Sequence, residues 1–316
     1  WRRALELETI RVQRPQVTIH SSPASVSKTA PAHATDTTES ANALTAVRVG
    51  DLRVHDGTLT RGPGDTHPRD SLWGVSLHLR RLALDSAKGQ TPQAYLAQRF
   101  VEGSVDGYRR QVPDAPYRVQ VGSGKVSRLD STLRVTDIRV EPAVPEAAFG
   151  QYYEYRVNRF RTSADKVSVV GADVQSFVGE GALRAARIRV EEWILDVYRD
   201  NHPPESPNDP PPPTPQEAVE RLDRALRIDT LRLQNSRIRY RKRPDGSPRT
   251  GHITFDDLWA TGYNLTTASE RMSPATPAVV EAQTRVNGAG LLNATFRLPL
   301  RAPHLNLSFR GRLGPM

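Results

Sequence analysis

The chain has 316 residues, contains no cysteine and carries a formal net charge of +9. The absence of cysteine excludes a disulfide framework and thiolate metal sites. No apolar run approaches the ~20 residues that a transmembrane helix needs. Only 37% of the residues are hydrophobic, a low share that both one-faced sheets and loose polar segments produce.

The positive charge comes from 44 Lys and Arg against 35 Asp and Glu, and arginine dominates. A basic chain favours an anionic partner such as nucleic acid or lipid. Here, however, the arginines alternate with apolar residues along the whole chain and do not gather into one patch with aromatics between them. This pattern favours a solvated polar face over a nucleic-acid groove.

The first hundred residues predict strands with one long interruption. Residues 1–20 alternate weakly around Pro15, which needs a wider connection than a tight hairpin. Segment 21–43 is rich in Ser, Thr and Ala and is predicted to be a loose insertion. Asp56-Gly57 is a favourable type I′ turn pair, so we expect a hairpin in which Val54 faces Leu59.

The middle of the chain predicts further strands and two short helices. Trp73–Leu84 alternates cleanly apart from a phase shift at Arg80-Arg81 that suggests a bulge. Thr91-Pro92 reads as the start of a helix that runs to about Phe100, and Asp173 could cap a helical turn. Strands are expected at 117–121, 125–129, 131–140, 153–161, 166–170, 185–190 and 193–198.

The last third begins with a second loose insertion at 201–215, followed by a capping box at Thr214-Pro215-Gln216-Glu217 and an amphipathic helix. Ile228–Tyr240 then predicts a hairpin with its turn at Asn235-Ser236. Side chains alternate along a strand, so one face of this hairpin would be apolar and the other basic. The apolar residues are Leu231, Leu233, Ile238 and Tyr240, and the basic face carries Arg232, Arg237 and Arg239.

The chain ends as a meander, in which Ile253 and Phe255 extend the same apolar face and Asn287-Gly288 forms a turn. Together these elements predict an all-β fold with a few short helices, as one elongated domain over 1–316. We expect an antiparallel sheet curled into a U-shaped groove, and a closed β-sandwich is the alternative. The chain starts without Met inside a strand, so we expect it to be an excerpt of a longer protein.

The usual catalytic motifs are missing. The sequence has no G-x-S-x-G, no H-E-x-x-H and no P-loop, and its eight histidines are scattered. We therefore expect no enzyme and no catalytic, cofactor or metal site.

Three stretches resemble the AsmA-like and TamB-like bacterial envelope proteins. They are Ile188–Asp200 followed by a Pro-rich loop, a short helix and Ile228–Tyr240; Asp130–Pro142 followed by Phe149; and the closing Leu298–Met316. The likeness covers most of the chain and rests on the order of these features. The chain departs from the family in its Arg-heavy polar face, its Ser/Thr/Ala segment and the lack of an N-terminal membrane helix.

The resemblance implies a groove in the periplasm of a diderm bacterium that carries phospholipid acyl chains between the inner and outer membranes or maintains the envelope. The parent protein would be anchored in the inner membrane outside this chain. Its partners would be lipid acyl chains and the membrane, without nucleic acid, metal or cofactor. On this hypothesis the groove is lined by Val54, Leu59, Leu231, Leu233, Ile238, Tyr240, Ile253 and Phe255.

Two rival interpretations use the same residues differently. A closed sandwich or adhesin-like module would bury the apolar face in a core and hold no lipid. A binder of nucleic acid or another anionic polymer would use the arginine face, especially Arg237, Arg239, Arg241, Lys242, Arg243 and Arg249. In the expected hairpin Asp229 lies opposite Lys242, and Arg232 lies opposite Arg239 without neutralisation.

Overall fold

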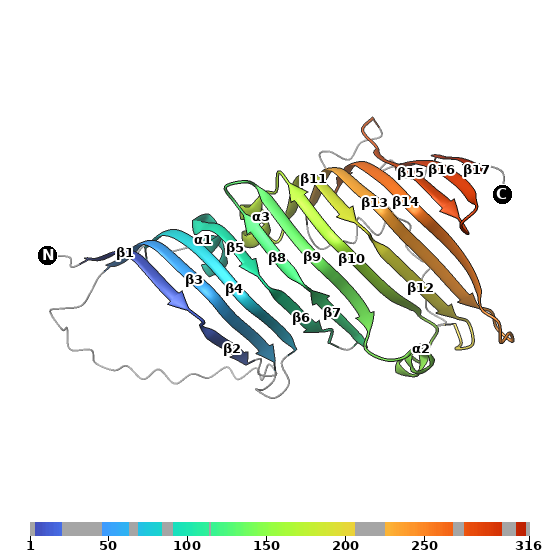
Figure 1. The fold of residues 1–316 in the computed structure, drawn as a ribbon, viewed down its shortest axis with the longest axis horizontal. Coiled ribbons are helices and arrows are strands. Elements are labelled where there is room, and N and C mark those ends of the chain that lie inside the picture. The colour runs from blue at the N-terminus through green and yellow to red at the C-terminus, as the bar shows by residue number, and fades with distance from the viewer. Residues whose placement is uncertain are drawn as a thin grey trace.

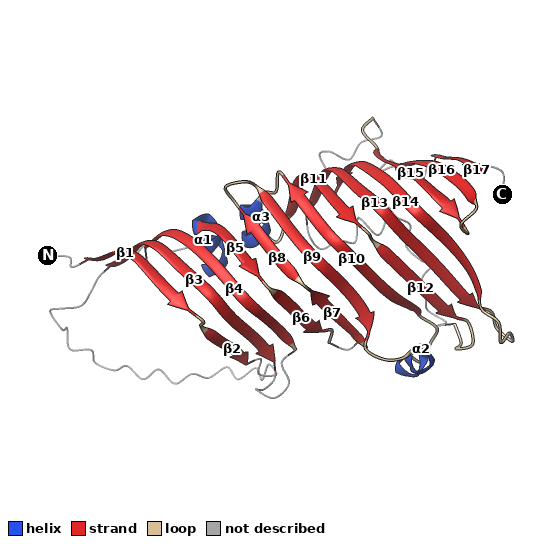
Figure 2. Ribbon diagram, in the orientation of Figure 1, coloured by secondary structure: helices blue, strands red, loops and turns tan. Residues whose placement is uncertain are grey.

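The computed structural model describes residues 4–20, 46–62, 69–83, 91–113, 115–205, 225–267, 275–298 and 308–313. Their strands all belong to one 17-stranded sheet, accompanied by a few short helices (Figure 2). The all-β prediction is confirmed. The sandwich alternative is wrong, because the described strands form a single layer and no second sheet packs on it.

The sheet is elongated, with β1 (Ala4–Gln13) and β2 (Gln16–His20) at one edge and β17 (Ser308–Leu313) at the other (Figure 1). The remaining strands are β3 (Ala46–Gly62), β4 (Asp70–Ala83), β5 (Phe100–Val105), β6 (Gly107–Gln111), β7 (Tyr117–Val121), β8 (Ser123–Ser127), β9 (Thr132–Pro142), β10 (Asn158–Val170), β11 (Leu183–Glu191), β12 (Ile194–Asp200), β13 (Leu226–Arg243), β14 (Gly251–Thr266), β15 (Ala278–Val286) and β16 (Gly290–Leu298).

The prediction of a purely antiparallel sheet is wrong at two places. β1 and β2 both pair with β3 in parallel, and β11 and β12 both pair with β13 in parallel. In each case two short strands lie one after the other beside a single long strand. The expected strands at 185–190 and 193–198 therefore do not pair with each other, although both exist as β11 and β12.

Both predicted hairpins are wrong. β3 runs straight through Asp56-Gly57, and β13 runs straight through Asn235-Ser236. Asp56 and Asn235 do take the left-handed conformation, with φ of 54° and 49°. Each serves as a β-bulge, marked by a shift in the pairing register with the next strand, instead of a turn.

These bulges belong to a line of irregular residues that crosses the sheet, which we call the crease. Seven further members of the crease are left-handed residues or lie at a break between two short strands in line, and the eighth, Asp165, lies opposite Asp137 where the pairing of β9 and β10 is interrupted. Adjacent crease positions are linked by backbone hydrogen bonds, such as Arg14 N to His55 O (2.8 Å) and Glu192 N to Gln234 O (3.0 Å). The crease comprises Arg14, Asp56, Gly74, Asp106, Gly122, Asp137, Asp165, Glu192, Asn235 and Asp257.

The crease keeps apolar residues on one face. Leu233 and Ser236 are three residues apart, so in a regular strand they would point to opposite faces. The extra residue at Asn235 restores the phase, and Ser236, Ile238 and Tyr240 continue the face of Leu233. In a hairpin with a two-residue loop at Asn235-Ser236, Leu233 and Ile238 would lie opposite each other on one face. The bulge adds one residue to a continuous strand, and it also leaves Leu233 and Ile238 on one face. The predicted face is therefore right although the predicted topology is wrong.

Further irregularities lie toward one end of the strands, where the long strands curve over in Figure 1. Arg81 is left-handed (φ 55°) and is skipped by the pairing between β3 and β4, but the register on either side of it is the same, so the bulge expected at Arg80-Arg81 is not seen in this pairing. Asn264 (φ 55°) is skipped in the same way between β13 and β14.

Two helices pack near this end. α1 (Pro92–Arg99) begins at Thr91, whose side chain accepts a hydrogen bond from Ala94 N, and α3 (Val174–Glu180) begins at Asp173, which caps Ser176 N. Both predicted caps are confirmed. Val174 packs with Leu79 and Phe100 in a buried cluster, so the helices cover one corner of the apolar face. The helix expected after residue 214 and most of both predicted insertions lie outside the described residues.

Candidate apolar groove

The apolar side chains form continuous rows across the sheet. Residues paired directly opposite each other on neighbouring strands share a face. Following the pairs from β1 to β17 gives an unbroken row of apolar residues and glycines, which we call the long row. It runs through Val12, Val54, Leu77, Gly103, Val126, Leu133, Val169, Ile188, Leu231, Gly262, Val280, Phe296 and Phe309.

Six of the eight predicted lining residues come together on β13 and β14. Leu231 belongs to the long row, and Leu233 lies two residues further along the same strand. Ile238 is paired with Phe255, and Tyr240 is paired with Ile253. This last group continues on the other side into β12, where Leu195 pairs with Ile238 and Val197 pairs with Tyr240.

The other two predicted residues lie far along the sheet on β3. Val54 does not face Leu59, because both belong to the same continuous strand. Val54 pairs with Leu77, and Leu59 pairs with Leu72. They therefore extend the apolar face toward β1 and β2 and are not part of the group on β13.

Sequence reasoning missed most of the long row, including Leu77, Val126, Val169 and Ile188. The signal was present in the spacing of the apolar residues. On β9 they stand at Leu133, Val135, Ile138 and Val140, in steps of two, three and two, so an odd step interrupts the alternation as the five-residue step from Leu233 to Ile238 does on β13.

The apolar face is only partly covered. All eight predicted lining residues are half-buried. Two clusters of strongly buried apolar residues lie near the curved strand ends, one around Val169, Ile188 and Ile228 and one beneath α3. The described strands form one sheet, so no second sheet covers the face.

The opposite face is polar, and several of its arginines pair with acidic side chains. Arg237 pairs with Asp256 (2.6 Å), and Arg239 and Arg241 both pair with Asp196. The carboxylate of Asp196 is buried. Burial alone would raise the pKa of Asp196, but the hydrogen bonds from Arg239 and Arg241 hold it below its ordinary value.

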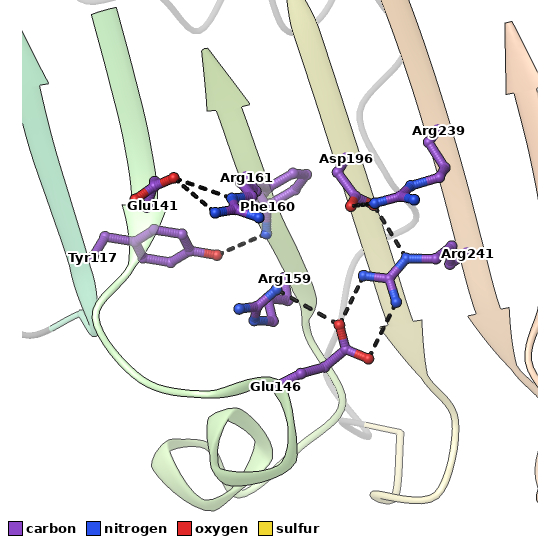
Figure 3. A network of polar contacts seen from close by, with 9 residues as sticks. All are labelled: Tyr117, Glu141, Glu146, Arg159, Phe160, Arg161, Asp196, Arg239 and Arg241. Carbon is purple, nitrogen blue, oxygen red and sulfur yellow. Dashed lines mark hydrogen bonds and ion pairs between the residues drawn. The ribbon is translucent and has the colours of Figure 1, made fainter.

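A short helix completes this network (Figure 3). α2 (Glu146–Phe149) presents Glu146, which accepts hydrogen bonds from both terminal nitrogens of Arg241 at 3.2 and 2.7 Å. This bidentate contact raises the pKa of Arg241. Glu146 also lies 3.7 Å from Arg159. The network therefore ties the connection after β9 to β10, β12 and β13.

These contacts weaken the case for an anionic-polymer site. Of the six cations proposed for it, Arg237, Arg239, Arg241 and Arg243 are engaged by acidic side chains. Arg239 faces Asp196 on β12 and Thr254 on β14, so it is not left opposite Arg232. Asp229 does not lie opposite Lys242 either; it forms an ion pair with Arg227 (3.3 Å). A hollow of about 480 Å³ between these arginines also contains Glu141, Asp196 and Asp256.

Among the described residues, no helix has the length and apolar character to cross a bilayer, and no cluster of three His, Asp or Glu is placed to hold a metal ion.

No protein-family model matches the chain, and no curated protein matches it in sequence.

Proposed function

We propose that this chain is a non-enzymatic segment of a lipid-carrying β-groove, in which the apolar face shields phospholipid acyl chains. The observation that carries the proposal is the long row, which stays apolar from β1 to β17. The row is only partly covered, because Val169 and Ile188 are buried in one cluster while its other side chains as far as Phe296 stay partly accessible. A soluble protein rarely leaves so long an apolar strip accessible unless a partner covers it.

The dimensions and chemistry suit an acyl chain. The long row crosses twelve steps between neighbouring strands, and at ~4.8 Å a step it extends for roughly 58 Å. Shielding a methylene group from water stabilises it by ~0.8 kcal/mol. Such a strip needs neither an acid, a base nor a metal to hold lipid, and it places no demand on the identity of the head group.

The resemblance to AsmA-like and TamB-like proteins supports the same proposal and adds a setting. We infer that the segment works in the periplasm of a diderm bacterium, within a parent protein anchored in the inner membrane. Lipid would then move along the strip between the inner and outer membranes.

Native mass spectrometry of the purified chain, followed by solvent extraction and lipid analysis, tests the proposal. We expect phospholipid to co-purify with the wild type and to be lost from Leu233→Asp, which places a charge on the apolar face. Arg232→Asp is the matched control, since it changes the neighbouring residue on the polar face. Circular dichroism should show both variants to be folded.

Lipid-free wild-type protein would contradict the proposal. Equal retention of lipid by a folded Leu233→Asp variant would contradict it too, because the lipid would then lie somewhere other than the apolar face.

A further inference from the structure

The two helices at the curved end of the sheet form a compact pair. Gly179 of α3 lies against α1, since a Cβ atom built on it would stand 3.5 Å from the Cβ of Ala97. Tyr95 of α1 is buried, and its hydroxyl bonds to both backbone groups of Ala83 at the end of β4. The pair is thus fixed to the rim of the apolar face.

This helix pair exposes apolar side chains that nothing in the described structure covers. Leu96 of α1 is 42% exposed, and Phe177 and Val178 of α3 are 43% and 38% exposed. Each helix has its small or apolar residues Ala97, Val174 and Gly179 packed inward, so the exposed residues are additional to those that hold the pair together.

Three arginines surround the same helices. Arg99 at the end of α1 donates to the carbonyl of Arg81 (3.0 Å), and Arg128 donates to the carbonyl of Gln98 (2.7 Å). Among the described residues, no acidic side chain pairs with Arg81, Arg99 or Arg128. This contrasts with the opposite ends of the strands, where Arg239 pairs with Asp196 and Arg241 pairs with Glu146.

A guanidinium has five N–H donors. The hydrogen bonds of Arg99 and Arg128 go to oxygen atoms of the protein and use only some of these donors. The guanidinium of Arg99 also lies over the ring of Tyr95, 4.9 Å from its centre. The exposed acid on the helix pair is Glu180, at the end of α3. The rim therefore keeps an excess of positive charge beside exposed apolar side chains.

We propose that the α1–α3 rim is a docking surface for a bilayer that contains anionic phospholipid. Apolar side chains beside arginines are the pattern of helices that lie in a membrane interface. Arginine binds phosphate through paired hydrogen bonds, and cations near an anionic bilayer strengthen its binding. Docking here would bring the rim of the apolar face against a leaflet, which goes beyond the shielding of acyl chains.

Vesicle flotation with the full chain tests this surface. We expect the wild type to float with vesicles of phosphatidylcholine and phosphatidylglycerol, and to bind vesicles of phosphatidylcholine alone much more weakly. Replacing Arg81 and Arg128 together by Gln should weaken binding to the anionic vesicles by about 25-fold, at about fivefold for each arginine. Added salt should weaken wild-type binding as well.

The matched control is Arg134→Gln with Arg232→Gln, which removes the same charge from exposed positions on the polar face. This control should bind as the wild type does. A second variant, Leu96→Ser with Phe177→Ser, should lose binding without any change of charge.

Three results would overturn the proposal: no binding to the anionic vesicles, equal binding to both vesicle types, or equal loss in the control pair. Selective binding to another protein, with no binding to vesicles, would overturn it too. Leu233→Asp separates the two proposals, because it should lose co-purified lipid and still float with anionic vesicles.

Discussion

Replacing Asn235 by Val should destabilise the protein through the backbone of the crease. Asn235 has φ of 49° in the middle of β13. A left-handed conformation costs an L-residue ~1–2 kcal/mol, and a β-branched residue sits at the upper end of that cost. The substitution also removes the hydrogen bond from the Asn235 amide to Glu192, worth ~0.5 kcal/mol at an exposed site.

Together these terms predict a loss of roughly 2 kcal/mol in the free energy of unfolding. At ~2 °C per kcal/mol for a large domain, the melting temperature should fall by about 4 °C. Thermal unfolding followed by circular dichroism measures this shift directly.

Two controls isolate the cause. Asn235→Gly loses the same hydrogen bond but accepts a positive φ, so it should cost only about 0.5 kcal/mol. Arg232→Val places valine at a regular exposed position of the same strand and should be close to neutral. If Asn235→Val were as stable as Asn235→Gly, the left-handed bulge would not be the source of the cost and the reasoning would fail.

Two further predictions concern the polar face and a stacked tryptophan. Asp196→Asn should destabilise the protein by ~1–2 kcal/mol at neutral pH, a figure reduced because Arg239 is half exposed. Because the pKa of Asp196 is lowered on folding, the stability that Asp196 contributes is present above the unfolded pKa of ~3.9 and is lost as pH falls through the folded pKa. Melting temperatures measured from pH 7 to about 3 should therefore converge for the wild type and Asp196→Asn at the acid end. Parallel curves would refute the assignment. A Cβ atom on Gly107 would stand 1.9 Å from the ring of Trp73, so Gly107→Ala should displace the indole and change tryptophan fluorescence. Gly150→Ala is the control, because a Cβ atom on Gly150 would have no other atom within 4 Å, and it should leave the fluorescence spectrum unchanged. An unchanged spectrum for Gly107→Ala would show that the ring of Trp73 does not lie over Gly107.

Local sequence predicted the faces of the sheet better than its connections. Asn and Asp adopt a positive φ in hairpin turns and in bulges alike, so Asp56-Gly57 and Asn235-Ser236 carry the same signal for both. The choice depends on which strand lies beside them, and that is decided by residues far away in the chain. Val54 pairs with Leu77 and Leu233 pairs with Ala260, neither of which is part of the predicted hairpins.

The apolar spacing held more information than the turn residues did. β9, like β13, has one odd step in its apolar spacing, yet it contains no residue pair that favours a turn and its sequence predicts a single strand. Comparing these two stretches would have indicated a bulge at Asn235. Helix starts were predictable for a different reason, since the caps at Thr91 and Asp173 act within three residues of the chain.

The strands follow one another across a single layer, and each packs mainly on its immediate neighbours. Such an arrangement behaves as a quasi-one-dimensional system, in which stability is close to a sum of nearest-neighbour terms. Fraying should therefore begin at the β1–β2 edge and at β17 and move inward, and amide hydrogen exchange should be slowest in the middle strands β9 to β13. A destabilising substitution would loosen its own stretch of the sheet while strands several positions away remain folded.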